Sequence, residues 1–200
     1  PLAQKKARPK LQPQPAPKSK DAPPPPAPPD WWGNDSELLV DFEINRPGDS
    51  RGRYRRPYVV VWVEDKEGKQ IRTVLLYISF GGPGPTRWLP DLKRWWRSED
   101  ARLSVDTKDV IYTISQPTRP PGKYSVVWDG RDNHGKPVPA GEYVIGVEAA
   151  REHGTYQGMR KLVTIGDKPF THELSGGAEL AGARIEYRRK PAAPPREGSP

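Results

Sequence analysis

Short runs of β-branched and aromatic residues recur through the middle of this chain, with turn-forming residues between them. Residues 58–64 are valine, tyrosine and tryptophan up to a final glutamate, a composition that favours a central β-strand. The polar, glycine-bearing residues 65–69 predict a hairpin turn into a second strand over residues 72–80. Residues 37–44 alternate apolar and acidic side chains, which is typical of a strand with one buried face.

Three further segments have the same character: residues 124–128, 141–150 and 156–165. Turn residues separate them, and no strand–helix–strand alternation is present. The sequence therefore predicts an all-β fold, an immunoglobulin-like antiparallel β-sandwich.

One segment changes its period. After the Gly- and Pro-rich residues 81–85, Trp88, Leu92, Trp95 and Trp96 follow at i, i+4, i+7 and i+8. This spacing predicts one aromatic face on a short helix that begins near Pro90. Packing onto the sheet is the first interpretation, and a platform on which a ligand stacks is the alternative.

The two ends of the chain have a different composition. Residues 1–30 are rich in proline and predict an extended, disordered tether that contributes nothing to a core. Residues 31–187 are then the folded domain, and residues 188–200 a disordered tail.

The net charge of +8 lies mainly in these ends. Residues 1–30 carry six basic and two acidic residues, and residues 186–200 carry four and two, so only about +2 is left for the domain. This argues against nucleic-acid binding and is compatible with contact to an anionic membrane surface.

The chain has no cysteine, which excludes disulfides and thiolate chemistry. No apolar run is long enough to cross a bilayer. Because the sequence starts at Pro1 and its single methionine is Met159, we expect an export signal or membrane anchor upstream.

The sequence around Trp128 resembles a hairpin of the immunoglobulin-like repeat found in flagellar hook-capping proteins. The resemblance rests on residues 123–132 and 137–143. It implies structural roles in the hairpin, with two aromatic rings pinning the strands and acidic and glycine residues forming the turn. The residues concerned are Trp128, Asp129, Gly130, Asp132, Gly141 and Tyr143.

A longer resemblance joins residues 88–96, 118–122 and 148–154 and covers most of residues 38–166. These segments resemble an uncharacterised family of predicted periplasmic domains, whose members occur beside or fused to PepSY-type transmembrane reductases and flavin transferases. The resemblance implies a non-catalytic accessory domain at the periplasmic side of the bacterial inner membrane. Its implied partner is a membrane-embedded redox protein or the upstream part of the same chain.

Many members of that family carry Asp-Ala-Val-Ser-Gly-Ala-Thr before an Arg-Pro-Pro-Gly motif, a stretch that resembles the acceptor motif in which FMN esterifies a threonine hydroxyl. Ser115 and Thr118 are retained here, whereas Tyr112, Gln116 and Pro117 replace the Asp, Gly and Ala of the acceptor motif. The proline and the missing glycine restrict the backbone next to the acceptor. We therefore expect no cofactor in this domain, with FMN on Thr118 as the alternative.

The turn Arg151-Glu152-His153-Gly154 is the second candidate site. An ion-paired turn explains it, and His153 as a haem ligand in a redox carrier is the alternative. No zinc spacing is present, and no catalytic residues are expected. The expected partner surface combines this turn with Trp88, Trp95 and Trp96, whose alternative use is a carbohydrate-binding sandwich.

Overall fold

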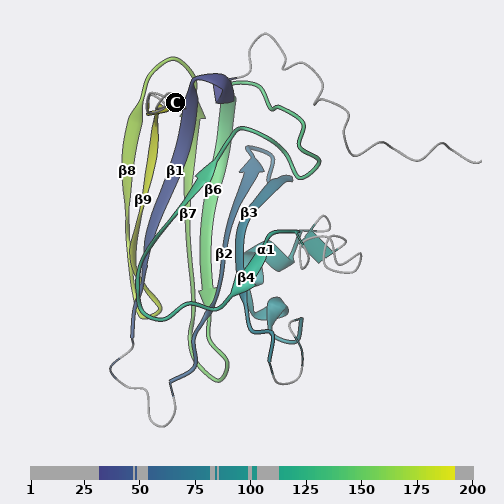
Figure 1. Cartoon of the computed structure of the whole chain (residues 1–200), viewed down its shortest axis with the longest axis vertical. Coiled ribbons are helices and arrows are strands. Elements are labelled where there is room, and N and C mark those ends of the chain that lie inside the picture. The colour runs from purple at the N-terminus through teal and green to yellow at the C-terminus, as the bar shows by residue number, and fades with distance from the viewer. Residues whose placement is uncertain are drawn as a thin grey trace, which may run out of the picture.

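Two β-sheets lie face to face in the computed structural model (Figure 1). The structure describes residues 32–46, 48, 54–81, 84, 86–98, 101–102 and 113–191. The four-stranded sheet has the order β5-β1-β9-β8, formed by β5 (Gly122–Trp128), β1 (Ser36–Ile44), β9 (Leu180–Arg189) and β8 (Phe170–Ser175). The five-stranded sheet has the order β4-β3-β2-β6-β7, formed by β4 (Ser115–Pro117), β3 (Gln70–Ile78), β2 (Tyr58–Asp65), β6 (Gly141–Ala150) and β7 (Tyr156–Ile165). The predicted all-β sandwich is confirmed.

The main core fills the space between the sheets. In β1 the side chains of Leu38, Val40, Phe42 and Ile44 point inward and are buried, as the alternation predicts. At one edge of this core, the Trp32 ring meets the rings of Trp128 and Tyr187 edge-on. Trp32 belongs to a short 3₁₀ helix, η1 (Trp32–Asn34), which precedes β1.

A second core covers the outer face of the five-stranded sheet. Here a helical insertion, formed by η2 (Leu89–Asp91) and α1 (Lys93–Trp96), lies beside β3 (Figure 1). Its buried side chains pack with Val60, Trp62 and Leu76. Both faces of β2 are therefore buried, which explains why its sequence is apolar throughout instead of alternating.

The predicted helix is present only as these two short pieces. Leu92 separates them with a non-helical ψ of 73°. Both pieces and the break itself still face the sheet, since Leu89, Leu92 and Trp95 are fully buried. Trp88 and Trp96 are only partly buried.

The predicted hairpin between β5 and β6 is wrong. These two strands lie in different sheets, so the residues between them cross from one sheet to the other. The aromatic pair does connect the two strands, because the rings of Trp128 and Tyr143 meet at 5.3 Å across the core. The turn chemistry was predicted correctly: Gly130 has a φ of 76°, and the Asp132 carboxylate accepts hydrogen bonds from two backbone amides.

Strands β4, β8 and β9 were not predicted. β4 also pairs in parallel with β3, so the five-stranded sheet is not purely antiparallel. β9 continues to Arg189, beyond the predicted domain end at residue 187. The tether and most of the tail lie outside the described residues. Among the described helices, none has the length and apolar character needed to span a membrane.

Candidate interaction site

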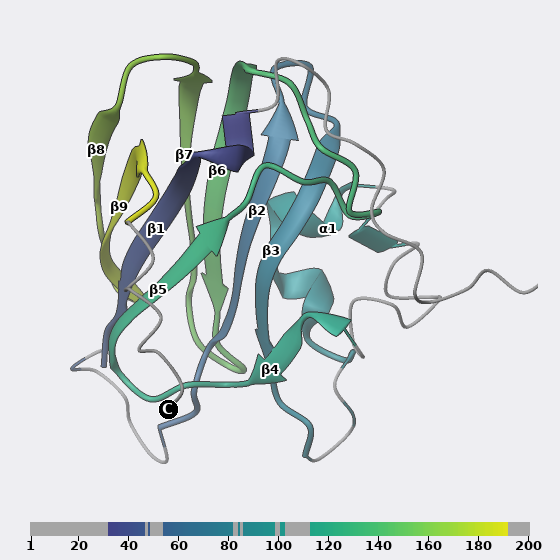
Figure 2. The ribbon, with the colours of Figure 1, turned by 45° about the horizontal axis from the view of Figure 1, so that its top comes forward.

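One end of the five-stranded sheet, whose strands Figure 2 shows, brings together four of the eight predicted site residues: Trp88, Thr118, Glu152 and His153. Strands β2 and β7 begin at this end, and β3, β4 and β6 finish there. We call this end the rim and define it by Arg55, Arg56, Phe80, Arg87, Trp88, Thr118, Glu152 and His153.

Thr118 lies at the β4 side of the rim. Its backbone amide donates to the carbonyl of Ile78 at 3.0 Å, and its carbonyl accepts a hydrogen bond from the Arg56 guanidinium at 3.3 Å. These bonds fix the backbone of Thr118 directly after β4, while its side chain is half-buried. Ser115 lies at the start of β4, opposite Leu76, and does not belong to the rim.

His153 and Trp88 lie together at the other side of the rim. Their ring centroids are 5.6 Å apart, and the Arg87 guanidinium lies 5.1 Å from the Trp88 ring. The His153 side chain is 74% exposed, and its φ of 54° is unusual for a residue other than glycine. Glu152 forms an ion pair with Arg55, which joins this side of the rim to the start of β2.

Arg151 has a structural role. Its guanidinium donates to the Glu179 carboxylate at 3.0 Å, and the Thr155 hydroxyl donates to the same carboxylate at 2.5 Å. Because Glu179 is fully buried, Arg151 balances a charge inside the fold and is not free for a partner. Sequence reasoning missed Glu179, which stands in a short polar stretch without strand periodicity.

Trp95 is not on a surface either. It is fully buried, and its indole N–H donates to the Thr73 hydroxyl at 3.0 Å. The aromatic face therefore packs onto the sheet, as the first interpretation had it, and offers no flat platform of three rings for a carbohydrate. Trp96 is half-buried beside Trp95, so of the three tryptophans only Trp88 contributes to the rim.

A buried carboxylate lies beneath the insertion. Glu148 in β6 is fully buried and accepts hydrogen bonds from the amides of Arg94 and Trp95, at 2.9 and 3.2 Å, and from the Tyr156 hydroxyl at 2.7 Å. Burial raises the pKa of Glu148, and the nearby Glu64 charge raises it further. Burial and the bond to Glu148 also raise the pKa of Tyr156.

Glu64 carries the second buried carboxylate of this region. Arg160 and Arg94 donate to it at 2.7 and 3.1 Å, and the Trp62 indole N–H donates at 3.0 Å. Glu64 and Glu148 thus tie the insertion to β2 and β6. Glu148 is a carboxylate within the otherwise apolar run 144–150, and sequence reasoning overlooked this signal of a buried charge.

The rim is an exposed, cationic and aromatic surface. Arg55, Arg56 and Arg87 outnumber Glu152, and Phe80 is 52% exposed. Within the described part of the chain, no group of three His, Asp or Glu residues could hold a metal ion. Arginine and aromatic side chains are the residues that dominate protein interfaces, so binding is the chemistry that this arrangement supports.

Comparison with known proteins identifies the family to which the chain belongs. Neither a search of curated proteins nor a search of solved structures found a match. A family model matches residues 38–182, from within β1 to the first residues of β9, and so spans most of the sandwich. The chain therefore belongs to the family described as "Predicted periplasmic protein (DUF2271)".

Proposed function

We propose that this chain is a non-catalytic interaction domain in the periplasm, and that its rim binds a membrane-embedded redox protein of the PepSY type. The observation that carries the proposal is the convergence of exposed aromatic and cationic side chains at one end of the sandwich. The family description supports the compartment. The resemblance of residues 88–96, 118–122 and 148–154 to PepSY-associated domains supports the partner.

The position of the rim, at the end of the sandwich opposite Trp32, supports this role. Trp32 lies next to the end of β9, since Ser36 pairs with Arg189. The rim lies at the opposite end, about nine residues of strand away, which corresponds to roughly 30 Å. Trp32, the first described residue, therefore lies at the end of the sandwich far from the rim.

A binding measurement tests the proposal. The full chain is titrated against a detergent-solubilised PepSY-type reductase from the same genome, and the Kd is compared with those of Phe80→Ala and Arg87→Glu. Each change removes an exposed rim side chain and should weaken binding by about tenfold, or about 1.4 kcal/mol. Val127→Ala is the control, because Val127 is 42% exposed on the other sheet. Equal Kd values for all four proteins would refute the role of the rim.

A second function, covalent flavin binding, is favoured by one observation. The Arg56 guanidinium lies 3.3 Å from the Thr118 carbonyl, at the same rim as the Trp88 and His153 rings. A cation suits the phosphate of FMN, and aromatic rings suit its isoalloxazine. In this step the Thr118 hydroxyl displaces AMP from FAD, so that an Oγ–P bond forms, the diphosphate bond breaks and the hydroxyl proton leaves to a base of the transferase.

Absorbance after denaturation tests this second function. The chain is coexpressed with a flavin transferase, denatured and washed. A flavin band that persists in the wild type and in Ser115→Ala, and disappears in Thr118→Val, supports covalent FMN. A wild-type chain without the band refutes it.

A further inference from the structure

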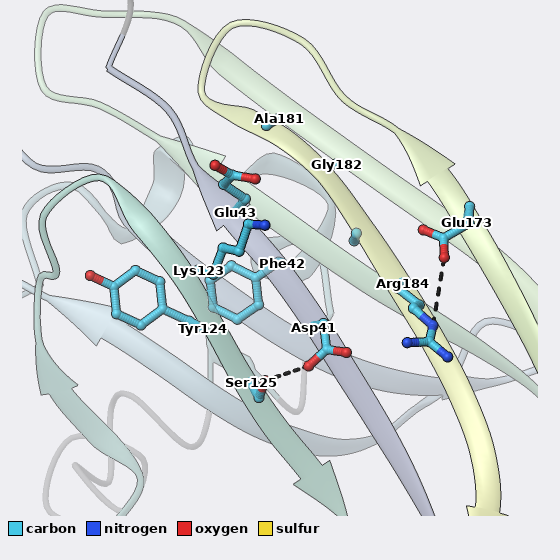
Figure 3. Close-up of a pocket in the computed structure, with 11 residues that line it drawn as sticks. Asp41, Phe42, Glu43, Lys123, Tyr124, Ser125, Glu173, Ala181, Gly182 and Arg184 are labelled. Carbon is cyan, nitrogen blue, oxygen red and sulfur yellow. Dashed lines mark hydrogen bonds and ion pairs between the residues drawn. The ribbon is translucent and has the colours of Figure 1, made fainter.

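The outer face of the four-stranded sheet carries a ladder of paired charges. Arg188 binds Glu37 at 2.9 Å, and Arg184 binds Glu186 at 2.9 Å and Glu173 at 3.6 Å. Ser125 donates to the Asp41 carboxylate in the same row as Arg184 (Figure 3). Pairs of this kind, between neighbouring strands or along one strand, are the ordinary way to satisfy charges on a solvent-exposed sheet.

The ladder is interrupted at its last row. Lys123 of β5 and Glu43 of β1 are directly opposite each other, and the next position, on β9, is Gly182. Within the part of the chain that the structure describes, the Lys123 and Glu43 side chains form no ion pair or hydrogen bond. An exposed pair of this kind gains only about 0–1 kcal/mol when it closes, so both charges stay available to a ligand.

A hollow lies over this row. Its volume is about 450 Å³, and its walls include Lys123, Glu43, Asp41 and Glu173 (Figure 3). Gly182 and Ala181 form its floor. Gly182 cannot easily carry a side chain, because a Cβ there would lie 3.1 Å from the Leu174 carbonyl oxygen. The volume falls within the range of small-ligand sites.

We propose that this hollow binds a peptide carrying a free α-amino-acid group, with its carboxylate on Lys123 and its ammonium on Glu43. Adjacent charges of opposite sign on the protein are complementary to adjacent charges of opposite sign on the ligand. Asp41 and Glu173 also line the hollow but are held by Ser125 and Arg184, so Lys123 and Glu43 carry the recognition. The two aromatic residues of the lining pack toward the core: Phe42 is buried and Tyr124 is partly buried.

The compartment supplies ligands of this class. Peptides of a bacterial cell wall that contain a diamino acid carry a free ammonium and carboxylate on one carbon, and the family is described as periplasmic. The hollow lies on the sheet opposite the one that forms the rim, so this proposal does not depend on the proposed function.

NMR titration of the full chain with a soluble muropeptide containing meso-diaminopimelate tests the site. We expect shifts at the Gly182 amide and a Kd at least about fivefold tighter than for the same muropeptide amidated at the diaminopimelate carboxylate or acetylated at its amine.

Two charge reversals, Lys123→Glu and Glu43→Lys, should each weaken binding of the unmodified muropeptide about fivefold or more. Lys168→Glu and Glu142→Lys make the same charge changes at exposed positions outside the hollow and should bind like the wild type. Equal affinities for the three muropeptides, equal effects of the hollow and control variants, or shifts away from Gly182 would each overturn the proposal.

Discussion

At the scale of single residues, Glu148 places an ionisable group inside the fold. It is fully buried, and three donors from the insertion and from β7 point at its carboxylate. Burial raises its pKa in the folded chain above the ordinary carboxyl value of the unfolded chain. The folded chain therefore holds this proton more tightly than the unfolded chain.

The pH dependence of stability tests this claim. The stabilisation that Glu148 contributes is complete below its unfolded pKa, about 4.3, and is lost as the pH rises through its folded pKa. Glu148→Gln cannot titrate, so the unfolding free energy of the wild type minus that of the variant should fall with rising pH. The fall is about 1.4 kcal/mol for each unit by which the pKa is raised. Urea unfolding between pH 4 and pH 8 measures this difference, and a rise with pH would contradict the assignment.

Gly146 makes a second prediction at this scale. A Cβ at this position would lie 2.4 Å from the ring of Trp62, which is itself fully buried. Gly146→Ala must displace that ring and should cost about 1–3 kcal/mol of unfolding free energy. Gly166→Ala is the matched control, because nothing lies within 4 Å of its Cβ position. Equal losses in the two variants, measured by chemical denaturation, would show that Trp62 moves without cost.

At the scale of elements, the helical insertion is held by its buried side chains. Trp95 fills the space over Val60, Trp62 and Leu76, whereas the neighbouring Trp96 is only partly buried. Trp95→Ala should therefore cost about 3–5 kcal/mol, and Trp96→Ala clearly less. Thermal unfolding of the two variants distinguishes them. A larger loss for Trp96→Ala would mean that the insertion packs in another way.

The elements that sequence reasoning found are those with a strong local pattern. The alternation of β1, the apolar run of β2 and the turn at residues 65–69 were all predicted, because local composition determines them. β4 is only Ser115–Pro117 and owes its strand form to pairing with β3, and β8 is a half-exposed edge strand. β4 has no pattern that a sequence can reveal, whereas β8 alternates Phe170, His172 and Leu174 with polar residues over six residues, a weak period-2 signal that sequence reasoning overlooked.

The candidate site was predicted in part for the same reason. The residues Trp88, Thr118 and His153 were selected, but nothing local shows that three distant segments meet at one end of a sheet. The predicted hairpin around Trp128 was wrong because the same turn residues can form either a connection within one sheet or a crossing from one sheet to another.

At the scale of the whole molecule, the sandwich has two different ends. One end holds η1 and the last residues of β9, and the rim occupies the other. The central claim is that the rim is the end that meets a partner.

Site-specific photo-crosslinking in intact cells tests that claim most directly. A benzoylphenylalanine replaces Phe80 at the rim in one variant and Val127, on the outer face of the four-stranded sheet, in another; both positions are exposed in the wild type. The account predicts a crosslink to the PepSY-type reductase from position 80 and none from position 127. Crosslinks from position 127 alone, or of equal yield from both positions, would contradict it.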